Sequence, residues 1–134
     1  MSSLSDVRWL DFPTNQDERG ILTSIEGGQD IPIEIKRVFF MHQVVAERGG
    51  HAHRDTDQVL FAVNGTLTIE LSDGESKIIE KVGDPRRGLF IPRMIFTRMY
   101  NFSPDSVCMV LANTHYDRSK SIRTYEEFLQ ILKK

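Results

Sequence analysis

Two histidines stand two residues apart in the segment His51-Ala52-His53. In an extended strand, residues i and i+2 point to the same face, so both imidazoles are expected to project together. The ordinary pKa of imidazole, about 6.5, lets it give and take protons near neutral pH. The pair therefore indicates half of a metal site or an acid/base pair. The plainer alternative is two solvent-facing histidines on an edge strand.

The elements that would carry this pair are short strands separated by turns. Strand-like runs occupy residues 21–25, 31–45, 59–63, 66–71, 77–79, 88–91 and 107–112. Asn64-Gly65 joins two of these runs and predicts a β-hairpin, because a type I′ turn needs positive φ at both central residues. Asp73-Gly74 predicts another turn. The run 107–112 is almost continuously apolar and is expected to be buried on both faces.

Only the end of the chain has a helical pattern. Thr124 is predicted to cap the helix, with Glu127 three residues later as the second member of a capping box. Four apolar residues then fall on one stripe: Tyr125, Phe128, Leu129 and Leu132. The predicted fold class is all-β, a sandwich or small barrel, with a C-terminal α-helix.

Length and composition favour one globular domain spanning residues 1–134. The chain has 134 residues, a net charge of −2 and 40% hydrophobic residues. This charge argues against a nucleic-acid groove, and no apolar run reaches the roughly 20 residues of a membrane span. Cys108 is the only cysteine, which excludes an internal disulfide, and the first residues lack the pattern of a signal peptide. We therefore expect a cytoplasmic protein.

The surroundings of the histidine pair resemble the paired motifs of the cupin superfamily, a double-stranded β-helix or jelly roll. The residues in question are His51, His53, Gln58, Gly65, Pro92, Met94, Thr97 and Asn101. In cupins that bind metal, a glutamate and a later histidine complete the ligand set, whereas Gln58 and Thr97 stand at those positions here. Neutral amide and hydroxyl groups are poor ligands for zinc or iron, so we expect no metal and no other cofactor.

A closer resemblance covers residues 6 to 132. It rests on these motifs, in order: Asp17-Glu18-Arg19-Gly20, Ile35-Lys36-Arg37-Val38, Arg48-Gly49-Gly50-His51-Ala52-His53-Arg54, Gln58-Val59-Leu60, Asn64-Gly65, Asp73-Gly74, Gly88-Leu89-Phe90, Val110-Leu111-Ala112, Tyr116-Asp117, Ile122-Arg123 and Tyr125-Glu126-Glu127-Phe128. Together they resemble the cupin-fold dTDP-4-keto-6-deoxyglucose 3,4-ketoisomerases of deoxysugar biosynthesis, which serves lipopolysaccharide and glycan assembly. The resemblance implies a homodimer, often with exchanged N-terminal strands, that acts on a dTDP-linked keto-deoxysugar without metal.

The implied reaction moves the keto group between C4 and C3 through an enediol, and a single imidazole over one face of the ring can transfer the proton. We assign His53 as this proton shuttle and His51 as the group that polarises the carbonyl; the reverse assignment stays open. Arg48, Arg19 and Arg37 are candidates for diphosphate or oxyanion contact. The remaining candidate substrate-binding residues are Gln58, Phe39, Thr97 and Tyr100.

The chain departs from the family at two places. Phe39-Phe40 stands where many members have two tyrosines, one of which assists catalysis, and Thr97 replaces a histidine. Tyr100 is a candidate to restore a phenol to the pocket. These losses keep two alternatives open: a non-catalytic cupin that binds a sugar nucleotide and, less favoured, a metal-dependent cupin enzyme.

Overall fold

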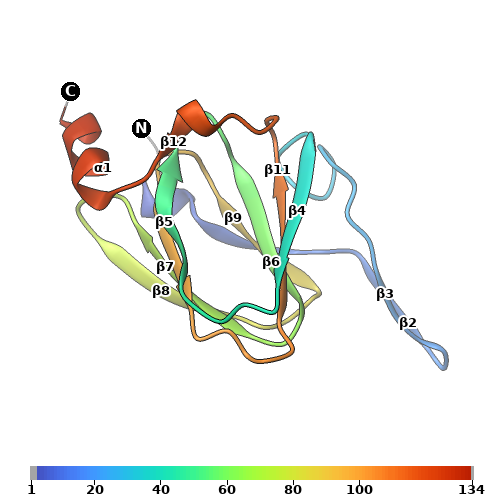
Figure 1. The fold of residues 1–134 in the computed structure, drawn as a ribbon. Helices are drawn as coiled ribbons and strands as arrows, with labels where there is room; N and C mark the ends of the chain where they lie inside the picture. Colours follow the sequence, from blue (N-terminus) through green and yellow to red (C-terminus); the bar gives the residue numbers. More distant parts are fainter. Residues whose placement is uncertain (1–2, 134) are drawn as a thin grey trace.

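The computed structural model describes residues 3–133 and consists mainly of two antiparallel sheets that face each other (Figure 1). The first sheet has the order β1 (Arg8–Asp11), β9 (Arg87–Ile91), β6 (Gln58–Asn64), β11 (Val107–Ala112), β4 (Arg37–His42). The second has the order β12 (Ser121–Ile122), β5 (Arg48–His53), β10 (Phe96–Tyr100), β7 (Leu67–Ser72), β8 (Lys77–Val82). This is the predicted all-β jelly roll, and the prediction is confirmed.

The main core lies between the two sheets and follows strand alternation. Leu60, Cys108 and Val110 from the first sheet pack with Ile69 and Leu71 from the second, and all five are buried. Burial raises the pKa of the Cys108 thiol to about 12, so this residue is part of the core and stays protonated. In β11, Leu111 is buried on the opposite face among a second apolar cluster, so the run 107–112 is covered on both sides as predicted.

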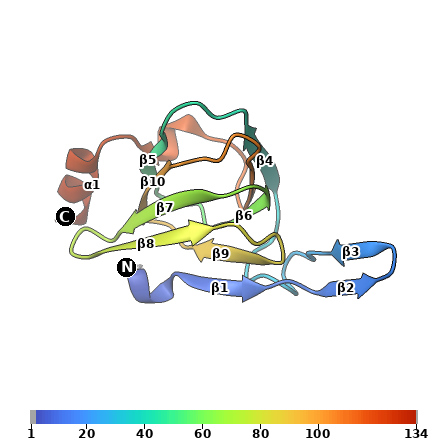
Figure 2. The same ribbon diagram turned by 90° about the horizontal axis from the view of Figure 1, so that it is seen from below.

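A two-stranded hairpin extends away from the two sheets. It is formed by β2 (Thr14–Asp17) and β3 (Gly20–Thr23), which pair only with each other (Figure 2). Its apolar side chains are open to solvent in the single chain: Ile21 is 55% and Leu22 is 63% exposed. The expected strand over 21–25 thus ends at Thr23, and it does not pack on the core.

The predicted hairpin at Asn64-Gly65 is wrong. β6 ends at Asn64, but it pairs with β9 and β11, whereas β7 pairs with β8 and β10 in the other sheet. Gly65 has φ of 70°, while Asn64 keeps a negative φ, so the turn is not type I′. Both edges of β6 are already paired, and the chain therefore crosses to the opposite sheet at this corner.

Gly65→Ala is expected to lower the free energy of unfolding by about 3 kcal/mol. A Cβ at this position would lie 2.7 Å from Ser106 Cα, in a left-handed conformation that only glycine adopts freely. Gly28→Ala is the matched control, because Gly28 also has positive φ but a Cβ added there would meet no atom within 4 Å. It is expected to cost about 1 kcal/mol. Urea denaturation of both variants measures the difference, and equal losses would contradict the steric explanation.

The chain ends in helix α1 (Tyr125–Leu132), as predicted. The Glu127 backbone N–H donates to Thr124 Oγ1 at 3.1 Å, so Thr124 is the N-cap. Phe128 is fully buried and packs against Ala52, Phe96 and Ile122. The helix therefore lies against the outer side of β5, the strand that carries both histidines (Figure 1). Within residues 3–133, no helix has the length and apolar character needed to cross a membrane.

Candidate active site

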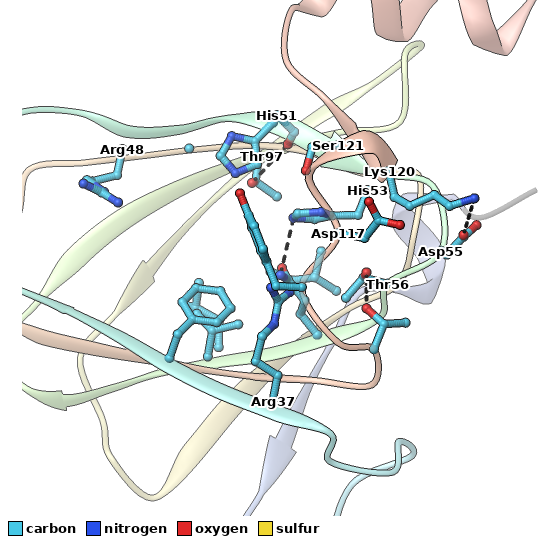
Figure 3. Close-up of a pocket in the computed structure, with 18 of the residues that line it drawn as sticks. Arg37, Arg48, His51, His53, Asp55, Thr56, Thr97, Asp117, Lys120 and Ser121 are labelled. Atoms are coloured by element: carbon cyan, nitrogen blue, oxygen red, sulfur yellow. Dashed lines mark hydrogen bonds and ion pairs between the residues drawn. The ribbon is translucent and has the colours of Figure 1, made fainter.

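A cavity of about 530 Å³ opens between the two sheets, beside β12. Its wall includes side chains from β4, β5, β6 and β10 and from the segment that follows β11. The polar and charged residues of this wall are Arg37, Arg48, His51, His53, Asp55, Thr56, Gln58, Thr97, Thr114, His115, Tyr116, Asp117, Lys120, Ser121 and Arg123. Figure 3 shows His51, His53, Thr97 and Ser121 on one side and Arg37 extending toward them from β4.

Both histidines of β5 face this cavity. Their ring centroids are 5.4 Å apart and the rings are nearly perpendicular, at 87°. Ala52 between them is fully buried on the other face, under helix α1. The alternative of two solvent-facing histidines on an edge strand therefore fails, because β5 lies between β12 and β10 and turns both rings inward.

The cavity favours the neutral form of both rings. The pKa of His53 is lowered to about 4, first by burial and then by the positive charges of His51, Arg37 and Arg123. The pKa of His51 is also lowered, chiefly by burial, although a backbone hydrogen bond with Gly49 opposes this shift. At neutral pH each imidazole is therefore unprotonated on one ring nitrogen and can accept a proton.

Gln58 and Thr97 are the residues for which the cupin resemblance implies a glutamate and a histidine in metal-binding members. Gln58 Nε2 lies 3.4 Å from His53 Nε2, and because an amide N–H donates, this contact leaves the Nε2 lone pair of His53 as the acceptor. Thr97 Oγ1 donates to the His51 backbone oxygen at 3.5 Å. Over residues 3–133, no three His, Cys, Asp or Glu side chains gather closely enough to hold a metal ion.

Three arginines give the cavity wall an excess of positive charge. Across the described residues, no carboxylate forms an ion pair with Arg37, Arg48 or Arg123. The Arg37 guanidinium lies over the rings of Phe39 and Tyr116, at 5.2 and 5.4 Å from their centroids, and its Nε is buried without a hydrogen-bond partner. Such a set of cations with free donors suits a diphosphate or an oxyanion.

The structure brings most of the predicted site residues together, but not Arg19 or Tyr100. Arg19 lies in the hairpin, where its side chain is 86% exposed and pairs with Asp17 at 2.7 Å. Tyr100 lies on the outer face of β10, next to Arg98, because Thr97 and Met99 occupy the inward positions of that strand. Tyr100 therefore does not restore a phenol to the cavity.

Among the cavity-wall residues that were not predicted as site residues, Tyr116 and Arg123 bear most on the chemistry of the site. Tyr116 and Arg123 both line the cavity, from the segment between β11 and helix α1. Each belongs to a motif that carries the family resemblance, Tyr116-Asp117 and Ile122-Arg123. These motifs were the available signal, but residues in an irregular segment have no strand alternation that predicts their orientation.

Comparison with known proteins places the chain in a family. The family described as "FdtA: WxcM-like, C-terminal" matches residues 5–133. The chain belongs to this family. A TDP-4-oxo-6-deoxy-alpha-D-glucose-3,4-oxoisomerase from Aneurinibacillus thermoaerophilus is 37% identical over 129 residues, which cover 93% of this chain and 91% of that protein.

Solved structures of 3,4-ketoisomerases have the same fold. A 3,4-ketoisomerase from Helicobacter canadensis superposes with a TM-score of 0.93 at 35% identity, covering 96% of this chain and 98% of the other. A histidine-to-asparagine variant of the 3,4-ketoisomerase QdtA from Thermoanaerobacterium thermosaccharolyticum gives 0.92 at 35% identity, covering 96% and 94%. That second structure is a complex with TDP-4-keto-6-deoxyglucose.

Proposed function

We propose that this FdtA-like chain is a sugar-nucleotide 3,4-ketoisomerase. It moves the keto group between C4 and C3 of a dTDP-linked 6-deoxyhexose through an enediol. The observation that carries the proposal is a pair of neutral imidazoles, 5.4 Å apart, in a cavity whose arginines have no carboxylate partners among the described residues. The relatives named as a 3,4-oxoisomerase and as 3,4-ketoisomerases, at 35–37% identity over nearly the whole chain, support the same substrate class.

His53 is the base in this proposal. Its neutral imidazole accepts the C3 proton of the 4-keto sugar, exchanges it with solvent and delivers a proton to C4 on the same face of the ring. His51, perpendicular to it, stabilises the negative charge that develops on the carbonyl oxygen. Burial keeps water from solvating this developing charge. A hydrogen-bond donor held in place in the cavity, such as His51, therefore stabilises the transition state more than the same donor would in water.

The arginines hold the anionic part of the substrate. Arg48 and Arg123 lie on the cavity wall, and neither guanidinium has an ion-pair partner among residues 3–133. A guanidinium binds phosphate oxygens with two parallel N–H donors. Arg37 lies close enough to His53 to lower its pKa and therefore also faces the reacting part of the sugar. Gln58 and Thr97 complete the wall beside the two histidines, and Phe39 provides an apolar surface.

The test is proton exchange at the reacting carbons. The chain, treated with EDTA, is incubated with dTDP-4-keto-6-deoxyglucose in deuterium oxide, and the ring protons are followed by NMR. We expect loss of the C3 proton signal and appearance of a 3-keto product with deuterium at C4. Binding of the sugar nucleotide without exchange would overturn the proposal in favour of a non-catalytic binding protein. Exchange that requires an added divalent metal would favour a metal-dependent enzyme.

In the profile of kcat/KM against pH, we expect the fall in activity on the acid side at a pH well below the ordinary imidazole pKa. A base must be neutral, and the pKa of His53 is lowered to about 4, so activity should hold as pH falls from 8 to 5 and be half lost near pH 4. Gln58→Glu places a carboxylate beside His53, which raises that pKa and moves this fall in activity to higher pH. Circular dichroism at each pH verifies folding. A fall in activity at a pH of about 6.5 in the unchanged chain would contradict the pKa that burial imposes.

We further propose that this single cupin-like domain acts as a homodimer. The outer face of edge strand β4 exposes Val38 and Phe40, the latter at 56%, and the hairpin exposes Ile21 and Leu22. Exposed apolar groups on a strand edge and a projecting hairpin suit exchange of N-terminal strands between two copies. Sedimentation velocity is expected to give twice the chain mass. A monomer at micromolar concentration would contradict the dimer.

A further inference from the structure

The cavity contains one phenol, and it does not come from the strand that the family resemblance indicates. Among the three tyrosines of the chain, Tyr100 lies on the outer face of β10 and Tyr125 contacts Ser72 Oγ through its hydroxyl, at 3.0 Å. Tyr116 alone lines the cavity. Phe39 faces the same cavity but has no hydroxyl, and Phe40 faces out.

Tyr116 is linked to the histidine pair through Arg37. The Arg37 guanidinium lies 5.4 Å from the centroid of the Tyr116 ring, and its positive charge also lowers the pKa of His53. Arg37 is therefore close to both the Tyr116 ring and the proposed base. Tyr116 is 66% exposed, which leaves its hydroxyl free to meet a ligand that enters the cavity.

We infer that Tyr116 is a catalytic residue that passes the proton between the sugar oxygens O3 and O4, while His53 passes the proton between C3 and C4. This inference rests on the proposed ketoisomerase function. It assigns to a residue after β11 the phenol role that Phe39 and Phe40 cannot perform, since neither has a hydroxyl group.

The proton balance of the reaction requires a second acid/base group. In the first step His53 takes the C3 proton and the Tyr116 phenol protonates O4, which gives a neutral enediol and a phenolate. In the second step the protonated His53 delivers its proton to C4 and the phenolate takes the O3 proton. The 3-keto product forms and both side chains return to their starting states, with no oxidant or reductant needed.

Tyr116→Phe tests the inference, because it removes the hydroxyl and keeps the ring against Arg37. We expect kcat to fall about a hundred-fold while KM stays within about three-fold, as for an interaction made mainly in the transition state. Adding Phe39→Tyr to this variant is expected to restore at least about ten-fold of the lost turnover, since position 39 faces the cavity. Phe40→Tyr is the matched control, because position 40 faces out and should restore nothing.

The outcomes separate this inference from the proposed function. If the unchanged chain does not exchange the C3 proton, the ketoisomerase proposal fails and the inference fails with it. If the unchanged chain is active and Tyr116→Phe retains kcat, or raises only KM, the inference alone fails. Restoration of turnover at both positions 39 and 40, or at neither, also overturns it.

Discussion

His53→Asn is expected to reduce kcat about a thousand-fold while the affinity for dTDP changes by no more than a few-fold. Asparagine has a similar shape, but its amide does not accept a proton from carbon at neutral pH. The diphosphate contacts assigned to Arg48 and Arg123 remain in this variant. Steady-state kinetics and titration calorimetry with dTDP measure the two quantities separately.

The control for this variant is His42→Asn, on the outer side of β4, where the ring lies 5.7 Å from Phe40 and away from the cavity. We expect unchanged kcat there. The assignment of His53 would be contradicted if its replacement lowered stability and activity together, with the remaining folded fraction fully active. Exchange of the C3 proton in deuterium oxide at the rate of the unchanged chain would contradict it as well.

Phe128→Ala is expected to lower the free energy of unfolding by about 4 kcal/mol. Its ring is fully buried between helix α1 and the outer side of β5. The centroids of the Phe128 and Phe96 rings are 5.6 Å apart, and Ala52 belongs to the same apolar cluster. The loss combines the transfer of the ring to water with the cavity left behind, and the surrounding strands are held by their own ladders and cannot collapse to fill it.

Leu129→Ala is the matched control in the same helix, because Leu129 is only partly buried and keeps good helix propensity as alanine. It is expected to cost about 1 kcal/mol. Urea denaturation measures both. Equal losses for the two variants would show that the helix is stabilised by its own propensity rather than by the contact of Phe128 with β5.

Local patterns predicted the parts of the fold that depend on neighbouring residues. Strand alternation was enough to place His51 and His53 on one face, and the Thr124 cap was enough to start the C-terminal helix. The Asn64-Gly65 hairpin failed because turn chemistry is local, whereas the choice of strand partner depends on which edges are free. β6 has no free edge, and the chain therefore turns toward the other sheet.

The site was harder to predict than the fold, for a related reason. Alternation places Thr97 and Tyr100 on opposite faces of β10, but the sequence does not indicate which face is inward. Tyr116 and Arg123 reach the cavity from the segment after β11, through contacts with residues far away in sequence, such as Arg37. No periodicity in that segment could have assigned them to the cavity.

The β2–β3 hairpin has a consequence for assembly. A two-stranded hairpin on its own is marginally stable in water, and the side chains of Ile21 and Leu22 find no apolar cover within one copy of the chain. In the proposed dimer, ordering of this hairpin becomes a bimolecular event. On dilution, residues 14–23 should then lose their ordered structure before the two large sheets unfold. Raising the protein concentration should restore the structure of these residues.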